Sequence, residues 1–442
     1  MFFSELQFDV KSKTPLYKQL EAFIISGIRD GKLQVGFKLP SIRNLVKTLA
    51  ISKPTVENAL RHLVCNGYLT VKNKSGYFVA DLGLALNQNF YENQLENNTP
   101  ILFDFRDSAV DKEIFPITLW RRAIHRATKS NTIFSAYRNP QGEFCLRNAI
   151  AKYAFNARGV SCSAKQVVIA SGMQALIPIL INLLPQEDKH IAFEGKGFPQ
   201  LEIIFKNHGW TIEYFQLQQL KKIKARVIYI GSEINGGRRR LTSTERIQFL
   251  KTIQENNQIV LEDDYTGEFR NHSEAASSLQ GMNPSANIVY LSSFSRLLTP
   301  TLRISFMVLP LSLIQNLDQK IRFYNQSAST LEQLALSDFL NSGYLPRHVK
   351  ALRNQCTHKM FSLKKLIEQL APNLFLIQEA PSGLALLLEL QQGTFPVDFV
   401  TSMQSKGICL KQISEKTIVL GVTGIPLNKI NQATKTFIAS LT

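Results

Sequence analysis

The chain has 442 residues, of which 44% are hydrophobic and 19% charged, so a wholly disordered chain is excluded and more than one domain is expected. Lysine and arginine number 51 against 34 aspartate and glutamate. The resulting net charge of +17 makes a polyanion a candidate partner, although it says nothing about the fold.

The pattern of cysteines indicates a reducing compartment, and the N-terminal residues do not resemble a secretion signal. Five cysteines are scattered without a Cys-x-x-Cys pair or a His/Cys cluster, which argues against a zinc site or a disulfide framework. Glu5 and Asp9 interrupt the first ten residues, so we expect no signal peptide, and no apolar stretch of about 18 residues predicts a membrane span. We therefore expect a cytoplasmic protein without a membrane partner.

Three helices are predicted in the first 67 residues. A four-residue apolar spacing predicts a helix that starts at about Pro15 and ends at Gly31, with its stripe at Leu16, Leu20, Ile24 and Ile28. Ser41 caps a second, shorter helix, and Ser52 caps a third that ends at Gly67. A tight turn at residues 50–51 separates the last two helices.

A hairpin follows the third helix. Residues 68–71 and 77–80 read as two short strands, and residues 72–76 form a basic turn between them. Three helices followed by a hairpin of this kind predict a winged helix-turn-helix, an α+β domain.

Cations and short polar side chains gather where such a domain meets DNA. Residues 1–80 hold twelve lysines and arginines against five acidic residues. The third helix can lie in a major groove while cations around it contact phosphates. The candidate DNA-binding residues are Arg43, Ser52, Lys53, Thr55, Lys72, Lys74 and Gly76. From spacing alone, a solvated surface on an interaction domain remains open.

Four short motifs identify this region further: Pro15-Leu16-Tyr17, Gly31…Gly36…Leu39-Pro40-Ser41…Arg43, Ser52…Thr55-Val56 and Gly67-Tyr68-Leu69. Together they resemble the winged-helix domain of GntR-type bacterial transcription regulators. The resemblance implies that duplex DNA is the partner. Pro54 and Glu57 depart from the family pattern, in the helix that would meet DNA.

A change of composition separates this domain from the rest of the chain. Residues 81–101 are rich in asparagine, show little periodicity and include Pro100, which predicts a linker. The expected domains are therefore residues 1–80 and 102–442.

Strand and helix patterns alternate in the large domain. Short apolar runs predict strands at residues 167–170, 190–193, 227–230, 258–261, 287–292 and 304–309. Helical patterns occur at residues 117–128, 146–157, 244–255 and 329–340. This alternation predicts an α/β sheet with helices on both faces.

Polar groups follow three of these strands. Gly172 lies between a strand and a helix, where backbone N–H groups can approach a phosphate. Asp263 and Tyr265 are two residues apart and can share one face, as a carboxylate and a phenol suited to a pyridinium nitrogen and a ring oxygen. Ser293 and Arg303 bracket another strand end. From these residues alone, three alternatives without a bound ligand remain open: a plain turn at Gly172, an acidic strand end at Asp263, and a surface arginine at Arg303.

Six motifs appear in order in this domain: Phe115-Pro116…Trp120-Arg121-Arg122, Tyr137-Arg138-Asn139-Pro140-Gln141-Gly142, Ser171-Gly172-Met173-Gln174-Ala175-Leu176, Phe198-Pro199, Glu262-Asp263-Asp264-Tyr265 and Ser293-Phe294-Ser295-Arg296…Arg303. They resemble fold-type I, pyridoxal-phosphate-dependent aminotransferases, and specifically the MocR subfamily of regulators, which fuse a GntR winged helix to such a domain. The resemblance implies a three-layer α/β fold.

The resemblance also implies where a cofactor or effector binds. It assigns the phosphate to Gly172, Met173, Gln174, Ser293 and Arg303, and the ring to Phe198, Asn235, Asp263 and Tyr265. Tyr137 would contact the phosphate of the partner subunit, which implies a homodimer.

Arg296 is the main departure from the family. It replaces the lysine that forms the Schiff base, and a guanidinium is not a usable amine nucleophile. Residues 231–238 and the segment near residues 420–422 have also drifted. We therefore expect no transaminase activity, with pyridoxal phosphate either held non-covalently or lost.

Three functions remain in competition. The favoured one is a transcription regulator whose aminotransferase-like domain senses an unidentified small-molecule effector and dimerises without catalysis. The alternatives are a working aminotransferase with an attached DNA-binding domain, and a dimer scaffold without a ligand.

Overall fold

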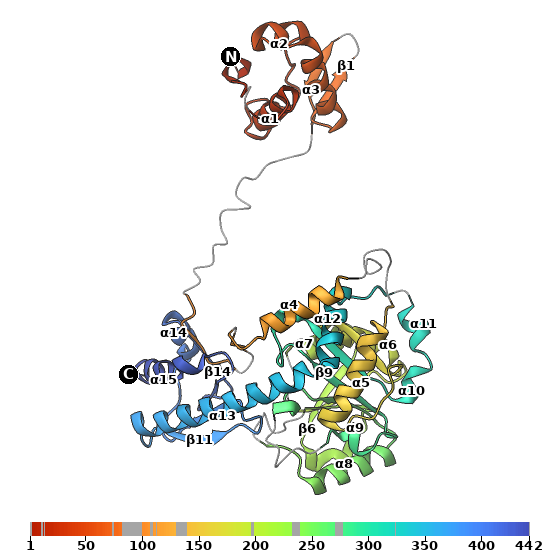
Figure 1. Ribbon diagram of the computed structural model, residues 1–442, viewed down its shortest axis with the longest axis vertical. Coiled ribbons are helices and arrows are strands. Elements are labelled where there is room, and N and C mark those ends of the chain that lie inside the picture. The colour runs from red at the N-terminus through yellow and green to blue at the C-terminus, as the bar shows by residue number, and fades with distance from the viewer. Residues whose placement is uncertain are drawn as a thin grey trace. The chain divides into compact units, whose positions relative to one another are not determined.

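The computed structural model contains two compact units, Met1–Asn98 and Thr99–Thr442 (Figure 1). It describes residues 2–9, 12, 14–72, 75–81, 100–106, 109–111, 113–129, 139–195, 199–231, 239–269, 277–322 and 324–441. Most of the expected linker at 81–101 lies outside the described residues, so its boundaries stay a prediction. Each unit is considered by itself below.

Unit 1 is the expected winged helix-turn-helix. Its elements are η1 (Phe2–Glu5), α1 (Leu16–Arg29), α2 (Ile42–Leu49), α3 (Lys53–Cys65), β1 (Leu69–Lys72) and β2 (Gly76–Val79). The strands pair antiparallel, with Leu69 opposite Val79. Leu20, Ile24 and Leu60 are fully buried in the core that joins the helices.

The turn between α2 and α3 follows from local chemistry. The Ser41 side chain accepts a hydrogen bond from the backbone N–H of Asn44 (3.2 Å), so α2 begins where the sequence predicts. Ala50 then adopts a left-handed conformation (φ 51°), which ends α2 and lets Ser52 start α3.

Unit 2 is built on a seven-stranded sheet in the order β4-β10-β9-β8-β7-β5-β6. The strands are β4 (Val167–Ser171), β5 (His190–Glu194), β6 (Thr211–Phe215), β7 (Val227–Gly231), β8 (Ile259–Asp263), β9 (Ile288–Ser293) and β10 (Ile304–Val308). β10 runs antiparallel to both neighbours, and the other pairs are parallel. All six predicted strands are present, and β6 is the one the sequence did not reveal.

Helices cover both faces of this sheet, which confirms the three-layer fold. Val167 and Ile169 of β4 pack toward α4, α5, α12 and α13, whereas Val168 and Ala170 pack toward α6 and α7. The helices are α4 (Ile117–Ala127), α5 (Phe144–Arg158), α6 (Met173–Leu183), α7 (Pro199–Asn207), α8 (Ser243–Glu255), α9 (Leu279–Met282), α10 (Leu311–Ile314), α11 (Leu317–Ile321), α12 (Thr330–Asn341) and α13 (Tyr344–Leu370). Three 3-10 turns accompany them: η4 (Leu217–Lys222), η5 (Gly267–Phe269) and η7 (Pro300–Leu302).

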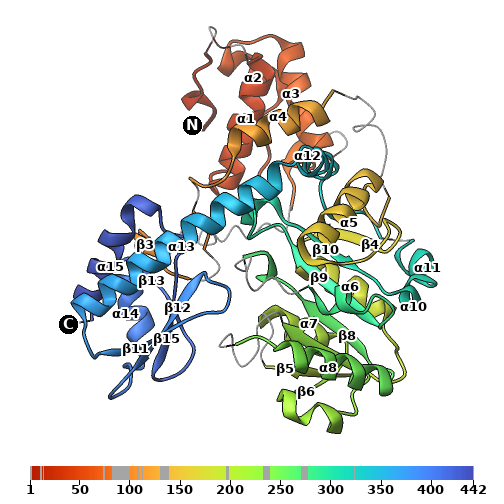
Figure 2. The same cartoon turned by 60° about the horizontal axis from the view of Figure 1, so that its bottom comes forward.

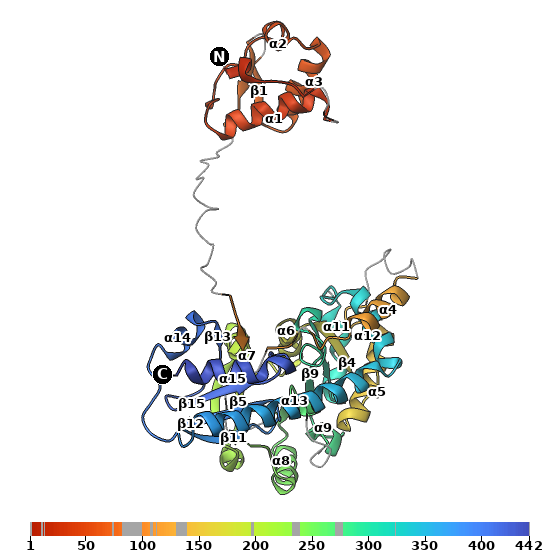
Figure 3. The same cartoon turned by 60° about the vertical axis from the view of Figure 1, so that its left-hand side comes forward.

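A smaller C-terminal layer completes unit 2. Figure 2 shows its antiparallel sheet, ordered β11-β12-β15-β14, beside α13, and Figure 3 shows α13 and α15 side by side. Its elements are β11 (Phe375–Glu379), β12 (Ala385–Leu390), α14 (Phe399–Ser405), β13 (Ile408–Cys409), β14 (Lys411–Gln412), β15 (Thr417–Gly421), η8 (Leu427–Lys429) and α15 (Ile430–Ala439). β13 pairs in parallel with β3 (Phe103–Asp104), so the first strand of unit 2 joins this layer.

The sheet topology brings the candidate polar residues to one edge. The carboxyl ends of the parallel strands β7 and β8 lie beside the start of β10 and the turn between β4 and α6. In α/β sheets, ligands bind outside the carboxyl ends of the strands. Within the described part of the chain, no helix is long and apolar enough to cross a membrane.

Candidate functional sites

The N-terminal turn of α3 is held by two of the predicted DNA-binding residues. The Ser52 hydroxyl accepts a hydrogen bond from the backbone N–H of Thr55 (3.4 Å), and the two hydroxyls lie 2.7 Å apart. Pro54 occupies the first turn, where its missing N–H costs nothing. Ser52 and Thr55 therefore shape the leading turn of the recognition helix.

Cationic side chains line a groove beside this turn. The groove has a volume of about 630 Å³ and is bounded by the start of α2, the start of α3 and the wing. It brings the predicted residues Arg43, Lys53 and Gly76 together, and Arg43 and Lys53 are exposed. Lys38 also lines the groove and escaped the sequence analysis, although it directly precedes the Leu39-Pro40-Ser41 motif.

The wing orients a further cation. The Lys72 ammonium lies 4.9 Å from the centre of the Phe78 ring, and that of Lys38 lies 5.8 Å from the same centre. In such a contact, the negative face of the aromatic ring attracts the cation and keeps it in place. Gly76 has φ 111°, a conformation that favours glycine, where the second wing strand begins. Lys74 lies outside the described residues.

Glu57 offsets the charge of Lys53. Its carboxylate lies 3.6 Å from the Lys53 ammonium, one helical turn away, and both side chains are exposed. An exposed pair of this kind contributes little to stability. Its larger effect is to place a negative charge on the helix that is predicted to contact DNA.

In unit 2, Gly172 and Arg303 form a cradle for an anion. Gly172 has φ 81° and caps the start of α6, so Met173 and Gln174 present the first N–H groups of that helix. A Cβ at Gly172 would lie 2.9 Å from Arg303 Nη2, so only glycine allows this approach of the guanidinium. The structure thus brings four of the predicted phosphate-binding residues together.

Ser293, the fifth, is engaged within the sheet. It is buried, and the Ser305 hydroxyl donates a hydrogen bond to its Oγ (2.9 Å), as does the backbone N–H of Ser295 (3.3 Å). Its hydroxyl therefore positions the start of the turn that leads to Arg296.

Asp263 is suited to a pyridinium nitrogen. The Tyr229 hydroxyl donates a hydrogen bond to Asp263 Oδ2 (2.6 Å), whereas Oδ1 is buried without a hydrogen-bond partner of standard geometry among the described residues. Burial raises the pKa of Asp263 to about 6, and the bond from Tyr229 opposes part of that rise. A cationic N–H beside Oδ1 would satisfy the orphaned oxygen.

Arg296, which the resemblance aligns with the lysine of the family, lies beside Tyr265 and Phe269. Its side chain is buried, and its guanidinium carbon lies 5.1 Å from the centre of the Tyr265 ring and 5.8 Å from that of Phe269. The arginine therefore covers the phenol that the resemblance assigns to the ring oxygen. Tyr137, Phe198 and Asn235 lie outside the described residues.

A buried lysine near this site escaped the sequence analysis. Lys359 on α13 is completely buried, and its Nζ lies 3.4 Å from Asp111 Oδ2. Burial raises the pKa of the Cys356 thiol to about 11, and the positive charges of Lys359 and Arg296 oppose this rise. Lys359 therefore lies in the neighbourhood of Arg296, although the two are far apart in the sequence.

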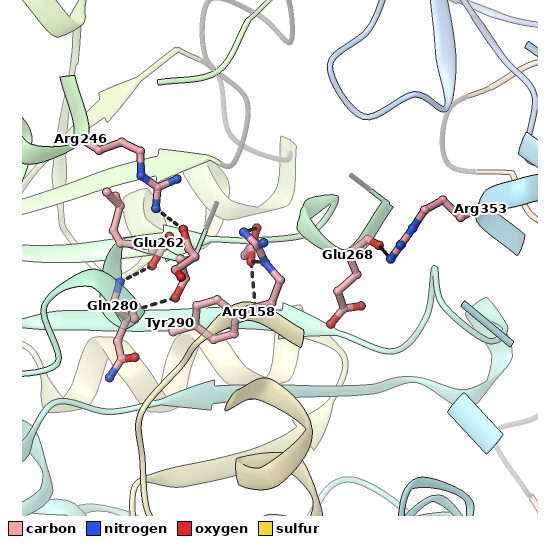
Figure 4. A network of polar contacts seen from close by, with 12 residues as sticks. Arg158, Arg246, Glu262, Glu268, Gln280, Tyr290 and Arg353 are labelled. Carbon is pink, nitrogen blue, oxygen red and sulfur yellow. Dashed lines mark hydrogen bonds and ion pairs between the residues drawn. The ribbon is translucent and has the colours of Figure 1, made fainter. Parts of the chain in front are cut away.

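A polar network supports β8 from the face opposite Asp263 (Figure 4). Arg158 Nε donates to Asp264 Oδ2 (2.5 Å), which also accepts from the Tyr290 hydroxyl (3.0 Å). Glu262 accepts from the backbone N–H groups of Leu279 (2.6 Å) and Gln280 (3.0 Å) at the start of α9. The acids on either side of Asp263 are thereby fixed.

The residues present fit pyridoxal phosphate at two of its three ends. The cradle at Gly172 and Arg303 suits a phosphate, and the orphaned Asp263 oxygen suits a ring N–H. At the aldehyde end, the resemblance aligns Arg296 with the lysine of the family.

Two family models match the chain. Residues 16–79 match the gntR family of bacterial regulatory proteins, and residues 103–393 match aminotransferase class I and II. The uncharacterized HTH-type transcriptional regulator YdeL of Bacillus subtilis (strain 168) is 30% identical over 449 residues, which cover 95% of this chain and 96% of that protein. The probable rhizopine catabolism regulatory protein MocR of Rhizobium meliloti is 24% identical, with coverage of 95% and 92%.

Solved structures show the same fold for unit 2. A kynurenine aminotransferase of Pyrococcus horikoshii superposes with a TM-score of 0.66 at 18% sequence identity. The match covers 78% of this chain and 91% of that one. At this identity the likeness concerns the fold alone.

Replacing Glu57 with glutamine is expected to strengthen binding to any duplex DNA. The substitution frees Lys53 and removes a negative charge near phosphates, so affinity at low salt should rise about threefold to tenfold, with a steeper salt dependence. Fluorescence anisotropy of a labelled duplex, titrated at several salt concentrations, measures both.

Glu255→Gln is the matched control for Glu57→Gln. Glu255 forms the same one-turn pair with Lys251 (3.9 Å) on the exposed surface of α8 in unit 2, so it should leave DNA binding unchanged. Equal behaviour of the two variants would contradict the placement of α3 against DNA.

Replacing Asp263 with asparagine is expected to stabilise unit 2 at neutral pH but not at acid pH. The folded-state pKa of Asp263 is raised to about 6, so the proton-linked stability of the wild type is present below about pH 4 and lost as pH rises through about 6. Asparagine is neutral at every pH, so the free energy of unfolding of the variant relative to the wild type should rise by about 2–3 kcal/mol from about pH 4 to above about pH 6.

Urea unfolding at about pH 4 and about pH 7.5 tests the Asp263 prediction. Both tryptophans, Trp120 and Trp210, belong to unit 2, so their fluorescence follows that unit. Asp398→Asn, at an exposed acid, is the control. An advantage of Asp263→Asn that does not vary with pH would refute the raised pKa.

Proposed function

Since the chain belongs to the family of MocR-type HTH transcriptional regulators, which join a gntR-family DNA-binding domain to a domain of aminotransferase class I and II, we propose that unit 2 is a non-catalytic sensor that controls DNA binding by unit 1. The protein is a DNA-binding transcription regulator. As its target is DNA, we place it in the cytoplasm.

The observation that carries the proposal is the environment of Arg296. A guanidinium keeps its proton at physiological pH and cannot attack a carbonyl carbon. Burial between the Tyr265 and Phe269 rings holds this cation where the family has an amine. Loss of the amine would remove the chemistry and leave a positive charge at the site.

The remaining residues of the site bind and orient. Pyridoxal phosphate, when bound, supplies an aldehyde and an electron-withdrawing ring. Gly172 and Arg303 would hold its phosphate, and Asp263 would hold the ring nitrogen. Tyr229 keeps Asp263 in place through its hydrogen bond (2.6 Å). Without a covalent link, these contacts alone must offset the entropy of holding a small ligand, so we expect weak, reversible binding.

We propose further that unit 2 forms a homodimer. The resemblance places Tyr137 at the subunit boundary, and Phe144, just after the motif that contains Tyr137, is 63% exposed and therefore available to a partner. Two-fold symmetry would then require two related half-sites in the operator.

Borohydride treatment in the presence of pyridoxal phosphate tests the loss of lysine chemistry. We expect no stoichiometric lysine adduct in peptide mass mapping and no amino-group transfer in a transaminase assay. A single adduct at Lys359, the buried lysine near Arg296, would show that the nucleophile lies on α13. Measurable transamination would overturn the regulator-only function.

Light scattering of the full chain tests the dimer. We expect twice the monomer mass at micromolar concentration, and Phe144→Glu should shift the equilibrium toward the monomer because it buries a charge at the interface. Ile247→Glu on α8, at a side chain with 62% exposure, serves as the control. A wild-type protein that is monomeric at this concentration would refute the proposal.

A further inference from the structure

A second pocket opens on unit 2, on the far side of the turn that follows Asp263. It has a volume of about 620 Å³ and lies between α5, the end of α12, the start of α13 and η5. This volume is within the range of small-molecule sites. The pocket shares no lining residue with the candidate cofactor site described above.

Its walls combine apolar surface with cations. Leu340, Pro346 and Val349 supply an apolar side, on which Leu340 and Val349 are buried. Lys152 on α5 and Lys350 on α13 line the opening and are exposed. Among the described residues, neither lysine takes part in an ion pair with a carboxylate.

The floor carries a third cation and one acid. Arg353 Nη2 donates a hydrogen bond to the backbone carbonyl of Glu268 (2.6 Å), which aims the guanidinium along η5 (Figure 4). Glu268 is buried and hydrogen-bonded to Tyr153. Burial, together with nearby Asp264, raises the pKa of Glu268 to about 8, so its carboxyl is largely neutral at pH 7 and does not cancel the cations.

We propose that this pocket binds a small organic carboxylate with an apolar body. Lys152, Lys350 and Arg353 converge on the carboxylate, since a guanidinium and ammonium groups are its natural partners. The body lies against Leu340, Pro346 and Val349. The only acid in the lining is Glu268, which is buried, so a cationic ligand would find no exposed carboxylate to pair with.

The occupant would touch the turn that connects the two sites. Glu268 lies in η5, and the next residue, Phe269, packs beneath Arg296. A Cβ at Gly267 would lie 2.0 Å from Asp264 Oδ1 and 2.6 Å from Arg158 Nε, so the turn is held tightly against the buried ion pair. A carboxylate at this position therefore contacts a rigid element that ends in the candidate cofactor site.

Calorimetric titration of the full chain with 2-naphthoate tests the proposal, with 2-naphthamide as the uncharged analogue. We expect one site per chain with a Kd below about 1 mM, and binding of the amide at least about tenfold weaker. The double variant Lys152→Glu/Lys350→Glu should lose at least about tenfold in affinity for the carboxylate. Both side chains are exposed, so the fold is expected to persist, as tryptophan fluorescence can verify.

Two controls locate the binding. Lys206→Glu/Lys221→Glu reverses two exposed lysines on α7 and η4 and changes the net charge equally, so it should leave the affinity unchanged. Arg303→Gln alters the candidate cofactor site and should also leave it unchanged. Absence of saturable binding below about 1 mM, equal binding of the amide, or loss of binding in Arg303→Gln would each overturn the proposal.

Discussion

The buried ion pair between Arg158 and Asp264 is the constraint on which the architecture of unit 2 depends. β8 ends in Glu262 and Asp263, Asp264 follows directly, and alternation along the chain turns Glu262 and Asp264 to one face and Asp263 to the other. The guanidinium of Arg158 balances the charge of the Asp264 carboxylate, and two backbone N–H groups at the start of α9 donate hydrogen bonds to Glu262. Removing one partner of such a pair leaves an uncompensated buried charge, at a cost of about 3–5 kcal/mol.

The same pair determines what the candidate site can present. Its two neighbours are anchored from behind, Asp263 Oδ2 accepts from Tyr229, and Asp263 Oδ1 is buried without a partner of standard geometry among the described residues. Near it, Arg303 approaches the start of α6 closely, and Arg296 packs against Tyr265. The same fold can host different functions, so the function of unit 2 depends on these site residues.

Much of this could be predicted from local patterns in the sequence. The six central strands are buried apolar runs, and each was located to within one or two residues. Ser41 and Ser52 signalled the starts of α2 and α3 because capping depends only on neighbouring residues. In the C-terminal sheet, which was missed, β11 is mostly exposed and lacks a strong apolar signal, whereas β12 and β15 are largely buried apolar runs that the pattern could have revealed.

The parts of the site that escaped depend on distant partners. Asp111 and Lys359 are 248 positions apart, and Arg158 and Asp264 are 106 apart, so nothing local marks them as pairs. The stacking of Arg296 on Tyr265 likewise required the tertiary fold. The sequence could mark Arg296 as a departure from the family pattern, but not which side chains its guanidinium would contact.

The strand pairing of unit 2 has a consequence for synthesis of the chain on the ribosome. Strand β3 at Phe103 pairs with Ile408, and β4 pairs within its sheet only with β10, so neither can be completed until most of the chain has emerged. Unit 1 makes its core contacts among the earliest residues, and domains fold N-terminal first during translation. Each nascent chain therefore exposes a finished DNA-binding domain before the sheet of unit 2 can be completed.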